Sequence, residues 1–590
     1  MRIRIFFLLI GMLAAMVPAV AQPVIGATNG VLNASSYQQD IARGSWFVIF
    51  GSSLGPAALT SASGSPFPTE LAGTRVTFTP AAGGTAVEAR LWYTSAGQLA
   101  GLLPSSATAG DYDVRVVFNS QTSAARRVRV VERNFGFATV AQNGAGPAQA
   151  TNASLNNGVS LVRFTTGSLN FNGLTWQYRP GYRGETLILW GTGVGADAQS
   201  DVTGGSSGDQ TAAGSIRVIV GGTEITPTYA GRSSGSPGLD QINFVLPADA
   251  AFGCTATLQV RAGGRLSNLG SLAIANSGQA LCTHPTLTPA QLTRLDAGGT
   301  LTAGALTLTK ISSRVTVPTV GTIDSASETA GGYFSRYGVS QIADANFSLT
   351  QVGACTVFRR TGDITTILTG APPVALDAGN QLTLNGPNAS NRAVPNLIDQ
   401  TTSRRLNTYS ATLYVSGFMG FGGQGTPTLT QGSYTMAGTG GPDIGAFSAN
   451  INFPGTFTWT NQDSVPAVVP RSQNLPITWS GGGDGLVTIS GFAGSQVGGT
   501  QTNPIYDVAG FTCIAQASAG NFSVPSGVLQ QLPAVSGDVT SGAIGTVGVL
   551  AIPDAARGQG VFTAPLAAGG NVDFSYFSYA VGSSKVVGFN

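Results

Sequence analysis

The chain has 590 residues, of which 42% are hydrophobic and only 9% are charged, and its formal net charge is +2. So small a charge excludes the long-range attraction and the basic footprint that a nucleic-acid-binding protein needs. The 82 glycines and 30 prolines stay below the share typical of a disordered chain, and the apolar content is sufficient for packed cores. This composition predicts an all-β protein of roughly three to five domains, with many short strands joined by turns.

The N-terminus has the features of a secretory signal peptide over residues 1–21. Two arginines precede an apolar run from Ile5 to Val17, and Ala19-Val-Ala21 supplies a small-x-small cleavage pattern, so we expect cleavage after Ala21. The run is shorter than the roughly 20 apolar residues of a membrane span, and no later stretch is apolar enough to form one as a helix. The sequence therefore predicts an exported protein, secreted or held at the cell surface.

The front of the chain contains a duplicated unit. Arg43–Gly55 returns as Arg183–Gly195, and Gln98–Pro104 returns as Gln241–Pro247. In the first pair an apolar strand follows an Arg-Gly turn and ends at a glycine-rich loop, where glycine permits a positive φ or a close backbone approach. Two matches in the same order indicate duplication. We therefore expect β-sandwiches over 22–134 and 166–276, joined by a linker at 135–165.

Two segments of this region resemble a known family. The sequences VLNASSYQQDIARGSWFVIFGSSLGP and DQINFVLP are similar to the signature segments of uncharacterised immunoglobulin-like domains in secreted acidobacterial (Solibacter-type) proteins, over roughly residues 28–275. In the first domain Ala100 and Gly101 replace the Asn and the aromatic residue of the second segment. The resemblance implies tandem immunoglobulin-like sandwiches, and it implies no activity. The segment GFTCIAQASAGNFSVPSGVLQQLP resembles a tail that recurs in the same proteins.

The sequence after residue 276 predicts further β structure. After a linker at 277–290 we expect a β-rich domain over 291–445 and another over 446–590, and the two could form one unit. Strand candidates are Ser410–Ser416, Thr456–Thr460, Pro476–Ser480, Leu486–Ser490 and Val572–Val581, and short helices are expected at Pro289–Leu295 and Ser526–Leu532.

Export places the four cysteines, Cys254, Cys282, Cys355 and Cys513, in an oxidising compartment. Four cysteines allow three pairings. We favour Cys254–Cys282 and Cys355–Cys513, because each pair then lies within one region of the chain. The alternative is four free thiols.

Two motifs match catalytic or cofactor patterns, and both are better explained as loops. Gly51–Gly55 has the spacing of a G-x-S-x-G nucleophile elbow, but that elbow needs a strand-to-helix turn and a nearby base, and His284 is the only histidine. Gly420–Gly425 has the G-x-G-x-x-G spacing, but a strand-like run follows where a dinucleotide site needs a helix. We therefore expect no catalytic residue and no cofactor site.

Other side chains could bind a ligand, and each has a structural interpretation. Cys282 and His284 cannot hold zinc without a third ligand, and no Asp-rich calcium loop is present, so no metal is expected. The arginines of Arg126–Arg133 alternate with valines, which is typical of an exposed strand face. Trp459 and Trp479 lie in strands where alternation could expose them for stacking on sugar rings or bury them in a core.

Our first functional hypothesis is a secreted or cell-surface structural or binding protein without catalysis. Tandem sandwiches would display loops for adhesion to an extracellular partner, a matrix polysaccharide or a surface protein. The alternatives are an exported polysaccharide hydrolase, which needs a pair of carboxylates, and a carbohydrate-binding module that uses exposed aromatic rings. No nucleic-acid partner and no transmembrane segment after signal removal are expected.

Overall fold

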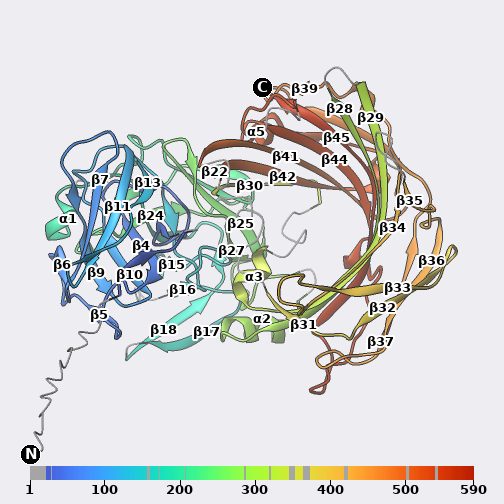
Figure 1. Cartoon of the computed structure of the whole chain (residues 1–590), viewed down its shortest axis with the longest axis horizontal. Helices are drawn as coiled ribbons and strands as arrows, with labels where there is room; N and C mark the ends of the chain where they lie inside the picture. Colours follow the sequence, from blue (N-terminus) through green and yellow to red (C-terminus); the bar gives the residue numbers. More distant parts are fainter. Residues whose placement is uncertain are drawn as a thin grey trace, which may run out of the picture.

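The computed structural model describes residues 21–590 apart from 28–29, 156–159, 172, 206–207, 251, 285–286, 318–320, 345–351, 363–372, 417–422, 500–503 and 539–542. Strands dominate this part of the chain, which confirms the all-β class. Two β-sandwiches lie side by side at one end of the molecule, and a large curved sheet forms the other end (Figure 1). Residues 1–20 lie outside the described part, so cleavage after Ala21 stays a prediction.

The first sandwich consists of two mainly antiparallel sheets that enclose an apolar core. One sheet contains β1 (Val24–Ile25), β4 (Trp46–Ser52), β10 (Gln98–Leu102), β9 (Arg90–Thr94) and β5 (Thr60–Ser61), with β2 (Val31–Asn33) also paired to β4. The other contains β3 (Ile41–Ala42), β13 (Arg126–Val131), β11 (Gly110–Phe118), β7 (Thr74–Pro80) and β6 (Glu70–Leu71), with β12 (Gln121–Thr122) and β8 (Val87–Glu88) at its margins. Alternate residues of β11 and β7 point into the core, as a half-buried strand requires.

The second sandwich has the same two-sheet plan. Its first sheet contains β17 (Gly167–Phe171), β18 (Leu174–Arg179), β16 (Ser160–Val162), β15 (Ala150–Asn152), β20 (Thr186–Thr192), β24 (Asp240–Val245) and β23 (Tyr229–Arg232), with β14 (Gly136–Phe137) paired to β20. Its second sheet contains β19 (Gly181–Tyr182), β27 (Gly270–Ala275), β25 (Gly253–Ala262), β21 (Arg217–Val220) and β22 (Thr223–Ile225), with β26 (Arg265–Leu266) paired to β25.

The strand register shows that the repeated motifs occupy equivalent places in the two sandwiches. In the first, β4 pairs with β10 so that Phe50 lies opposite Gln98. In the second, β20 pairs with β24 so that Trp190 lies opposite Gln241. Trp190 follows Phe50 by 140 residues, as Arg183 follows Arg43, and Gln241 follows Gln98 by 143 residues. A parallel pairing, β3 with β13 and β19 with β27, also recurs. The duplication that the sequence indicates is therefore preserved in the hydrogen-bonded pairing.

Residues 135–165, predicted to form a linker, are part of the second sandwich. It supplies β14, β15 and β16 to the first sheet, and Phe137 and Ala150 are fully buried in the core. The linker interpretation is therefore wrong for this stretch. Its Asn, Gly and Ser residues suggested a connection, but strands of two or three residues leave little periodicity to detect.

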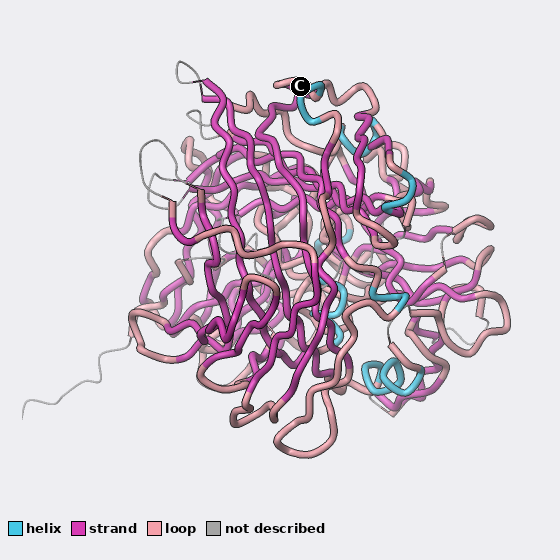
Figure 2. Tube along the Cα trace, turned by 90° about the vertical axis from the view of Figure 1, so that its right-hand side faces the viewer, coloured by secondary structure: helices cyan, strands magenta, loops and turns pink. Residues whose placement is uncertain are grey.

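The large sheet contains strands from residue 301 to the C-terminus. In spatial order they are β30 (Cys355–Gly362), β42 (Pro504–Gln516), β41 (Leu486–Gly499), β44 (Ile544–Ile552), β45 (Phe574–Phe589), β28 (Leu301–Val317), β29 (Gly321–Tyr337), β34 (Arg405–Val415), β33 (Ala389–Ile398), β32 (Gln381–Gly386), β36 (Gly432–Gly438) and β37 (Phe447–Phe453). Three short strands pair with long strands inside this order: β31 (Val374–Leu376) with β29, β35 (Gln424–Gly425) with β34, and β39 (Val468–Val469) with β45. The long strands run side by side through the molecule (Figure 2).

One face of this sheet is buried. Its side chains pack against β36 and β37, which fold back over β45, and against a three-stranded sheet of β38 (Phe457–Trp459), β40 (Leu475–Gly481) and β43 (Asn521–Val524). Because β36 and β37 lie on the outer side of the curve, the buried face is the convex one (Figure 1). The sheet includes strands from both sides of residue 445, so one continuous sheet spans 291–445 and 446–590.

Helices are few and short in the described residues, and none is long and apolar enough to cross a membrane. They are α1 (Ser200–Thr203), α2 (Pro289–Asp296), α3 (Val339–Asp344) and α5 (Ser526–Leu529), with 3-10 turns η2 (Gln462–Ser464), η3 (Ala517–Ala519) and η4 (Ala555–Arg557). Thr288 caps α2 through a capping box, and Leu292 and Leu295 extend the core of the second sandwich. This packing fixes the second sandwich to the start of β28.

The two disulfides join the predicted pairs. Cys254 of β25 is bonded to Cys282, and Cys355 of β30 is bonded to Cys513 of β42. The second bond connects directly opposite residues of neighbouring strands and closes a segment with a sequence separation of 158. It attaches the last strand of the large sheet to its neighbour.

Candidate functional site

A groove of about 520 Å³ lies between the second sandwich and the edge of the large sheet. The outer face of β21, β22 and β25 forms one wall. The opposite wall comes from 353–357, at the start of β30, and from the 522–531 segment around α5. Both β22 and β30 are terminal strands of their sheets. Its size and its place at a junction of two units are those of typical ligand sites.

The sandwich wall of the groove is polar because β25 alternates. Cys254, Ala256, Leu258 and Val260 point into the sandwich core, so the residues between them point outward. The outward residues that line the groove are Thr257, Gln259 and Arg261. Gln259 is only 6% exposed, and its side-chain Nε2 has no hydrogen-bond partner among the described residues. A buried amide donor without a partner is costly, and a turn of this side chain toward the groove would let a ligand oxygen supply the acceptor.

The opposite wall is mainly apolar, and the groove as a whole has no net charge. Phe522 and Val528 are partly buried against the neighbouring core and present their remaining surface to the groove. The described lining contains one cation and one anion, Arg261 and Glu224, which form an ion pair of 2.5 Å. An aromatic ring, hydroxyl groups and an unused amide donor suit a ligand that is uncharged and rich in oxygen.

A buried ion pair lies on the side of the second sandwich that faces the first. Arg232 of β23 and Asp240 of β24 lie 3.1 Å apart, and each is 1% exposed. The other oxygen of Asp240 accepts hydrogen bonds from the backbone N–H groups of Gly193 and Val194, which belong to the repeated glycine loop. Burial raises the pKa of Asp240 to about 6, against the opposing effects of Arg232 and the two N–H donors.

The glycine-rich motifs lie in loops and strands of the β structure. Ser53 has a φ of 53° in the loop after β4, and the chain continues to strand β5, where a nucleophile elbow would begin a helix. Of the second motif, residues 420–422 lie outside the described part, and Gln424–Gly425 forms β35, paired with β34. A dinucleotide site would have a helix at that point.

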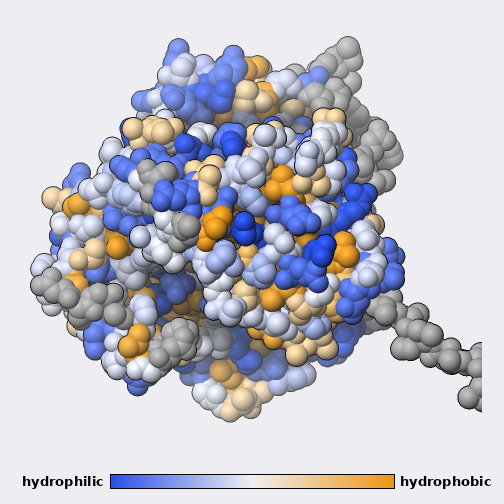
Figure 3. Space-filling view, turned by 90° about the vertical axis from the view of Figure 1, so that its left-hand side faces the viewer, coloured by the Kyte–Doolittle hydropathy of each residue, from blue (hydrophilic) through white to orange (hydrophobic). Residues whose placement is uncertain are grey.

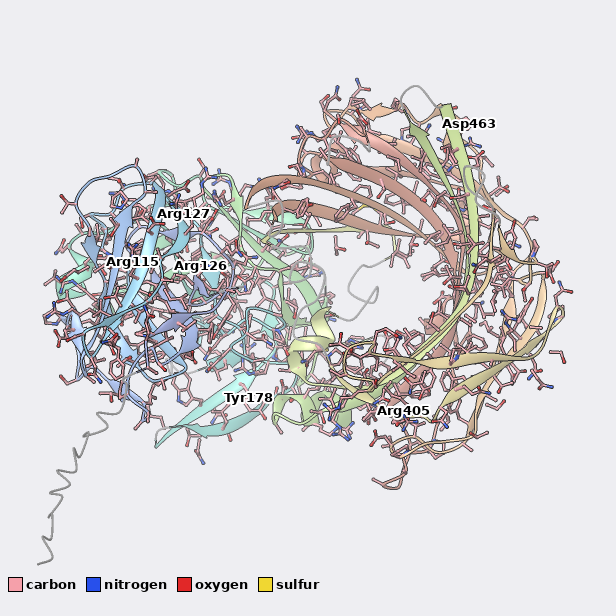
Figure 4. The ribbon with its side chains drawn as sticks, viewed as in Figure 1. Arg115, Arg126, Arg127, Tyr178, Arg405 and Asp463 are labelled. Atoms are coloured by element: carbon pink, nitrogen blue, oxygen red, sulfur yellow. A yellow bond between two sulfur atoms is a disulfide. The ribbon has the colours of Figure 1, made fainter. Side chains whose placement is uncertain are left out.

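The basic strand face of the first sandwich is matched by aspartates. On β13, Arg127 and Arg129 lie opposite Asp113 and Asp111 of β11, and the Arg127–Asp113 pair is 2.9 Å apart. Figure 4 labels Arg126, Arg127 and Arg115 on this sandwich. β13 lies beside the two-residue strand β3 rather than at the sheet edge itself. Arg127 therefore forms a cross-strand ion pair, and Arg129 occupies the matching position opposite Asp111.

The tryptophans divide between core and surface. Trp459 and Trp479 are each 4% exposed and lie in the core beside the large sheet, which removes them as sugar-stacking residues. Trp46 is half-buried and donates from its indole nitrogen to the carbonyl of Pro237 in the second sandwich. Trp92 is 48% exposed. The sandwich end of the surface shows apolar residues in small separate patches (Figure 3).

His284 lies in the connection between Cys282 and helix α2. Its Nδ1 accepts a hydrogen bond from the backbone N–H of Leu287 at 3.1 Å, and burial lowers its pKa to about 4. Protonation of Nδ1 would break this bond. In the described residues no group of three His, Cys, Asp or Glu side chains gathers to hold a metal ion.

We expect His284 to make the protein less stable at acid pH. Because its pKa is lowered in the folded state, the unfolded chain takes up a proton first, so stability falls as the pH decreases from about 6.5 to about 4. The loss between pH 7 and 4 should be roughly 1–3 kcal/mol greater in the wild type than in His284→Gln, which keeps an acceptor but does not titrate. Urea unfolding at both pH values tests this, and equal losses in the two proteins would contradict it.

Comparison of the sequence with models of known protein families and with curated proteins gives no match. Among solved structures, the chain is similar to SGBP-B from a complex xyloglucan utilization locus in Bacteroides uniformis, at 9% identity and a TM-score of 0.15, over 66% of this chain and 86% of that one. It is also similar to the ICAM-5 D1–D4 ectodomain fragment, at 11% identity and a TM-score of 0.11, over 92% and 98%. The titin I-band fragment I67–I69 gives 8% identity and a TM-score of 0.12, over 73% and 95%. TM-scores this low carry no argument about function.

Proposed function

We propose that this chain is an exported binding protein without catalysis, and that the groove between the second sandwich and the large sheet holds a segment of an uncharged extracellular polysaccharide. The observation that carries the proposal is the Gln259 amide, which is buried in the groove wall with an unused donor. Sugar chains present hydroxyl and ring oxygens that accept such a bond. The two disulfides are of the kind that persist after export.

The charges of the groove favour a neutral ligand over an acidic one. Arg261 is already paired with Glu224, so it has little positive potential left for a uronate or sulfate group. Hydrolysis is less well supported than binding. A glycosidase needs two carboxyl groups on either side of the scissile bond, and Glu224 is the only carboxylate among the described lining residues.

Adhesion through the sandwiches remains part of the proposal. The two sandwiches contact each other through side chains, among them Trp46 to Pro237 and Asn33 to the carbonyls of Asn134 and Thr192. These contacts hold the two sandwiches together as one rigid unit, and the first sandwich lies at the end of the molecule that is far from the large sheet (Figure 1).

We expect Gln259→Met to weaken binding of a neutral oligosaccharide about tenfold, because the variant keeps the volume but loses the donor. The measurement is isothermal titration of the mature chain with neutral β-linked hexasaccharides of glucose, mannose and xylose, and with hexagalacturonate as the acidic comparison. Gln121→Met, on the exposed hairpin strand β12, is the matched control and should bind as the wild type does.

The expected pattern is binding of at least one neutral hexasaccharide, no binding of the acidic one, and loss of affinity in the groove variant alone. No binding of any neutral oligosaccharide, or equal affinity in Gln259→Met and the wild type, would overturn the proposal.

A further inference from the structure

The concave face of the large sheet, opposite the buried convex face, carries partly exposed side chains. In β45 the odd-numbered residues from Ser575 to Val581 are buried in the core, while the even-numbered residues between them are partly exposed. We call the surface formed by these alternate residues of β42, β41, β44, β45, β28 and β29 the open face. It lies on the inner side of the curve, opposite β36 and β37 (Figure 1).

The open face has no charged side chain among its described residues. Charged residues of its central strands lie on the convex face: Lys310 pairs with Glu328, and Arg314 pairs with Asp324 and Asp463. Lys585 of β45 lies on that face too and donates to the carbonyls of Gln462 and Val465. Figure 4 places Asp463 beside the ends of β28 and β29. Because strand residues alternate between faces, the charges are confined to one side by register alone.

Hydroxyl groups form a row across the open face, perpendicular to the strands. The pairing register brings one residue from each of the six strands into line, and five of the six bear a hydroxyl: Thr512, Ser490, Gly548, Ser584, Ser313 and Ser325. The hydroxyls of Ser313 and Ser584 are 2.9 Å apart. Gly548 adds no hydroxyl, but a Cβ at this position would lie 3.1 Å from the Ser490 hydroxyl, so the glycine leaves that hydroxyl uncrowded.

Tyrosines form a second row on the same face. Tyr576 of β45 and Tyr333 of β29 both lie opposite Ala305 of β28, so the two rings are on either side of a small residue. Tyr333 is 40% exposed. Tyr576 is more enclosed, and burial raises its pKa to about 12. Rings next to hydroxyls, without charge, offer both the stacking surface and the hydrogen bonds that a sugar ring uses.

We infer that the open face is a second binding surface for a neutral polysaccharide, distinct from the groove. The inference rests on the proposed function for its class of ligand, but on different residues. Strands are about 4.8 Å apart, so the six-strand row extends for about 24 Å. A row of that length, with hydroxyls on five of its six strands, suits an extended chain of several sugar units. An acidic polymer would find no cation among the described residues of this face.

The test is the number of neutral hexasaccharides that the mature chain binds in isothermal titration. The wild type should bind two. Tyr333→Ala should lose the open-face site, through a decrease in affinity of at least about tenfold, while Tyr333→Phe keeps the ring and retains both sites. Trp92→Ala, which removes an exposed aromatic ring from the first sandwich, is the matched control and should also retain two.

The groove variant separates this inference from the proposed function. Gln259→Met should leave one site, and the double variant Gln259→Met, Tyr333→Ala should leave none. If Tyr333→Ala loses a site but Gln259→Met does not, the open face stands and the groove proposal fails. If Tyr333→Ala binds with the stoichiometry and affinity of the wild type while its circular dichroism is unchanged, the open-face inference is overturned.

Discussion

Replacing Arg232 by Met should destabilise the second sandwich by about 3–5 kcal/mol at pH 8, because Asp240 would remain buried without its cation. The two side chains are each 1% exposed and lie 3.1 Å apart. The variant also loses the hydrogen bond from Arg232 Nη2 to the carbonyl of Gly195. Urea unfolding followed by tryptophan fluorescence measures the change.

The pH dependence of this loss identifies its cause. The pKa of Asp240 is about 6 with Arg232 present, and removal of Arg232 raises it further. A carboxyl whose folded pKa is raised contributes stability that is present below its unfolded pKa, near 3.9, and is lost as the pH rises through the folded value. Arg232→Met should therefore be less destabilised at pH 5 than at pH 8.

Two further variants serve as controls. Adding Asp240→Asn to Arg232→Met removes the unpaired charge, keeps an acceptor for the N–H groups of Gly193 and Val194, and should recover part of the loss at pH 8. Arg127→Met, in an exposed pair, should have no measurable effect. If the double variant is less stable than Arg232→Met at pH 8, our account of this pair is wrong.

Removing the Cys355–Cys513 disulfide should lower the free energy of unfolding of the large sheet by about 2–5 kcal/mol. Its partners are separated by 158 residues, against 28 for Cys254–Cys282. Loop-closure entropy alone makes the longer loop worth about 1.5 kcal/mol more than the shorter one. Urea unfolding of two double variants measures this difference. One variant carries Cys355→Ala and Cys513→Ala, and the other carries Cys254→Ala and Cys282→Ala.

The same disulfide should affect binding. Cys355 begins β30, a terminal strand that pairs only with β42 among the described strands, and 353–357 forms part of the groove wall. We therefore expect the Cys355→Ala, Cys513→Ala variant to bind the groove ligand more weakly, while the Cys254→Ala, Cys282→Ala variant does not. Equal stability losses together with unchanged binding in both variants would contradict this role of the bond.

Much of the fold could be predicted from the sequence because its signals are local. The repeated strand-to-glycine-loop motif marks equivalent strands, and their pairing register is conserved between the sandwiches. Helix α2 has its signals in Thr288 and Pro289, which form the cap and the first turn. The strands of 135–165 cannot be predicted in this way, because each has too few residues to show a period.

The candidate sites depend on contacts between distant segments, which a sequence pattern does not contain. Thr257, Gln259 and Arg261 alternate with core residues, so an outward polar strand face could have been read from β25. The sequence pattern does not show that this face lies against 353–357 and Phe522. The hydroxyl row of the open face is equally hidden, since its members come from six strands that span residues 313 to 584.

Hydrogen–deuterium exchange of the mature chain, with and without a neutral oligosaccharide that binds, tests the groove most directly. Our account predicts slower exchange in 219–225, 255–261, 353–357 and 522–531 when the ligand is present, and loss of this protection in Gln259→Met. Binding of the oligosaccharide with no change in exchange in these four segments would contradict it.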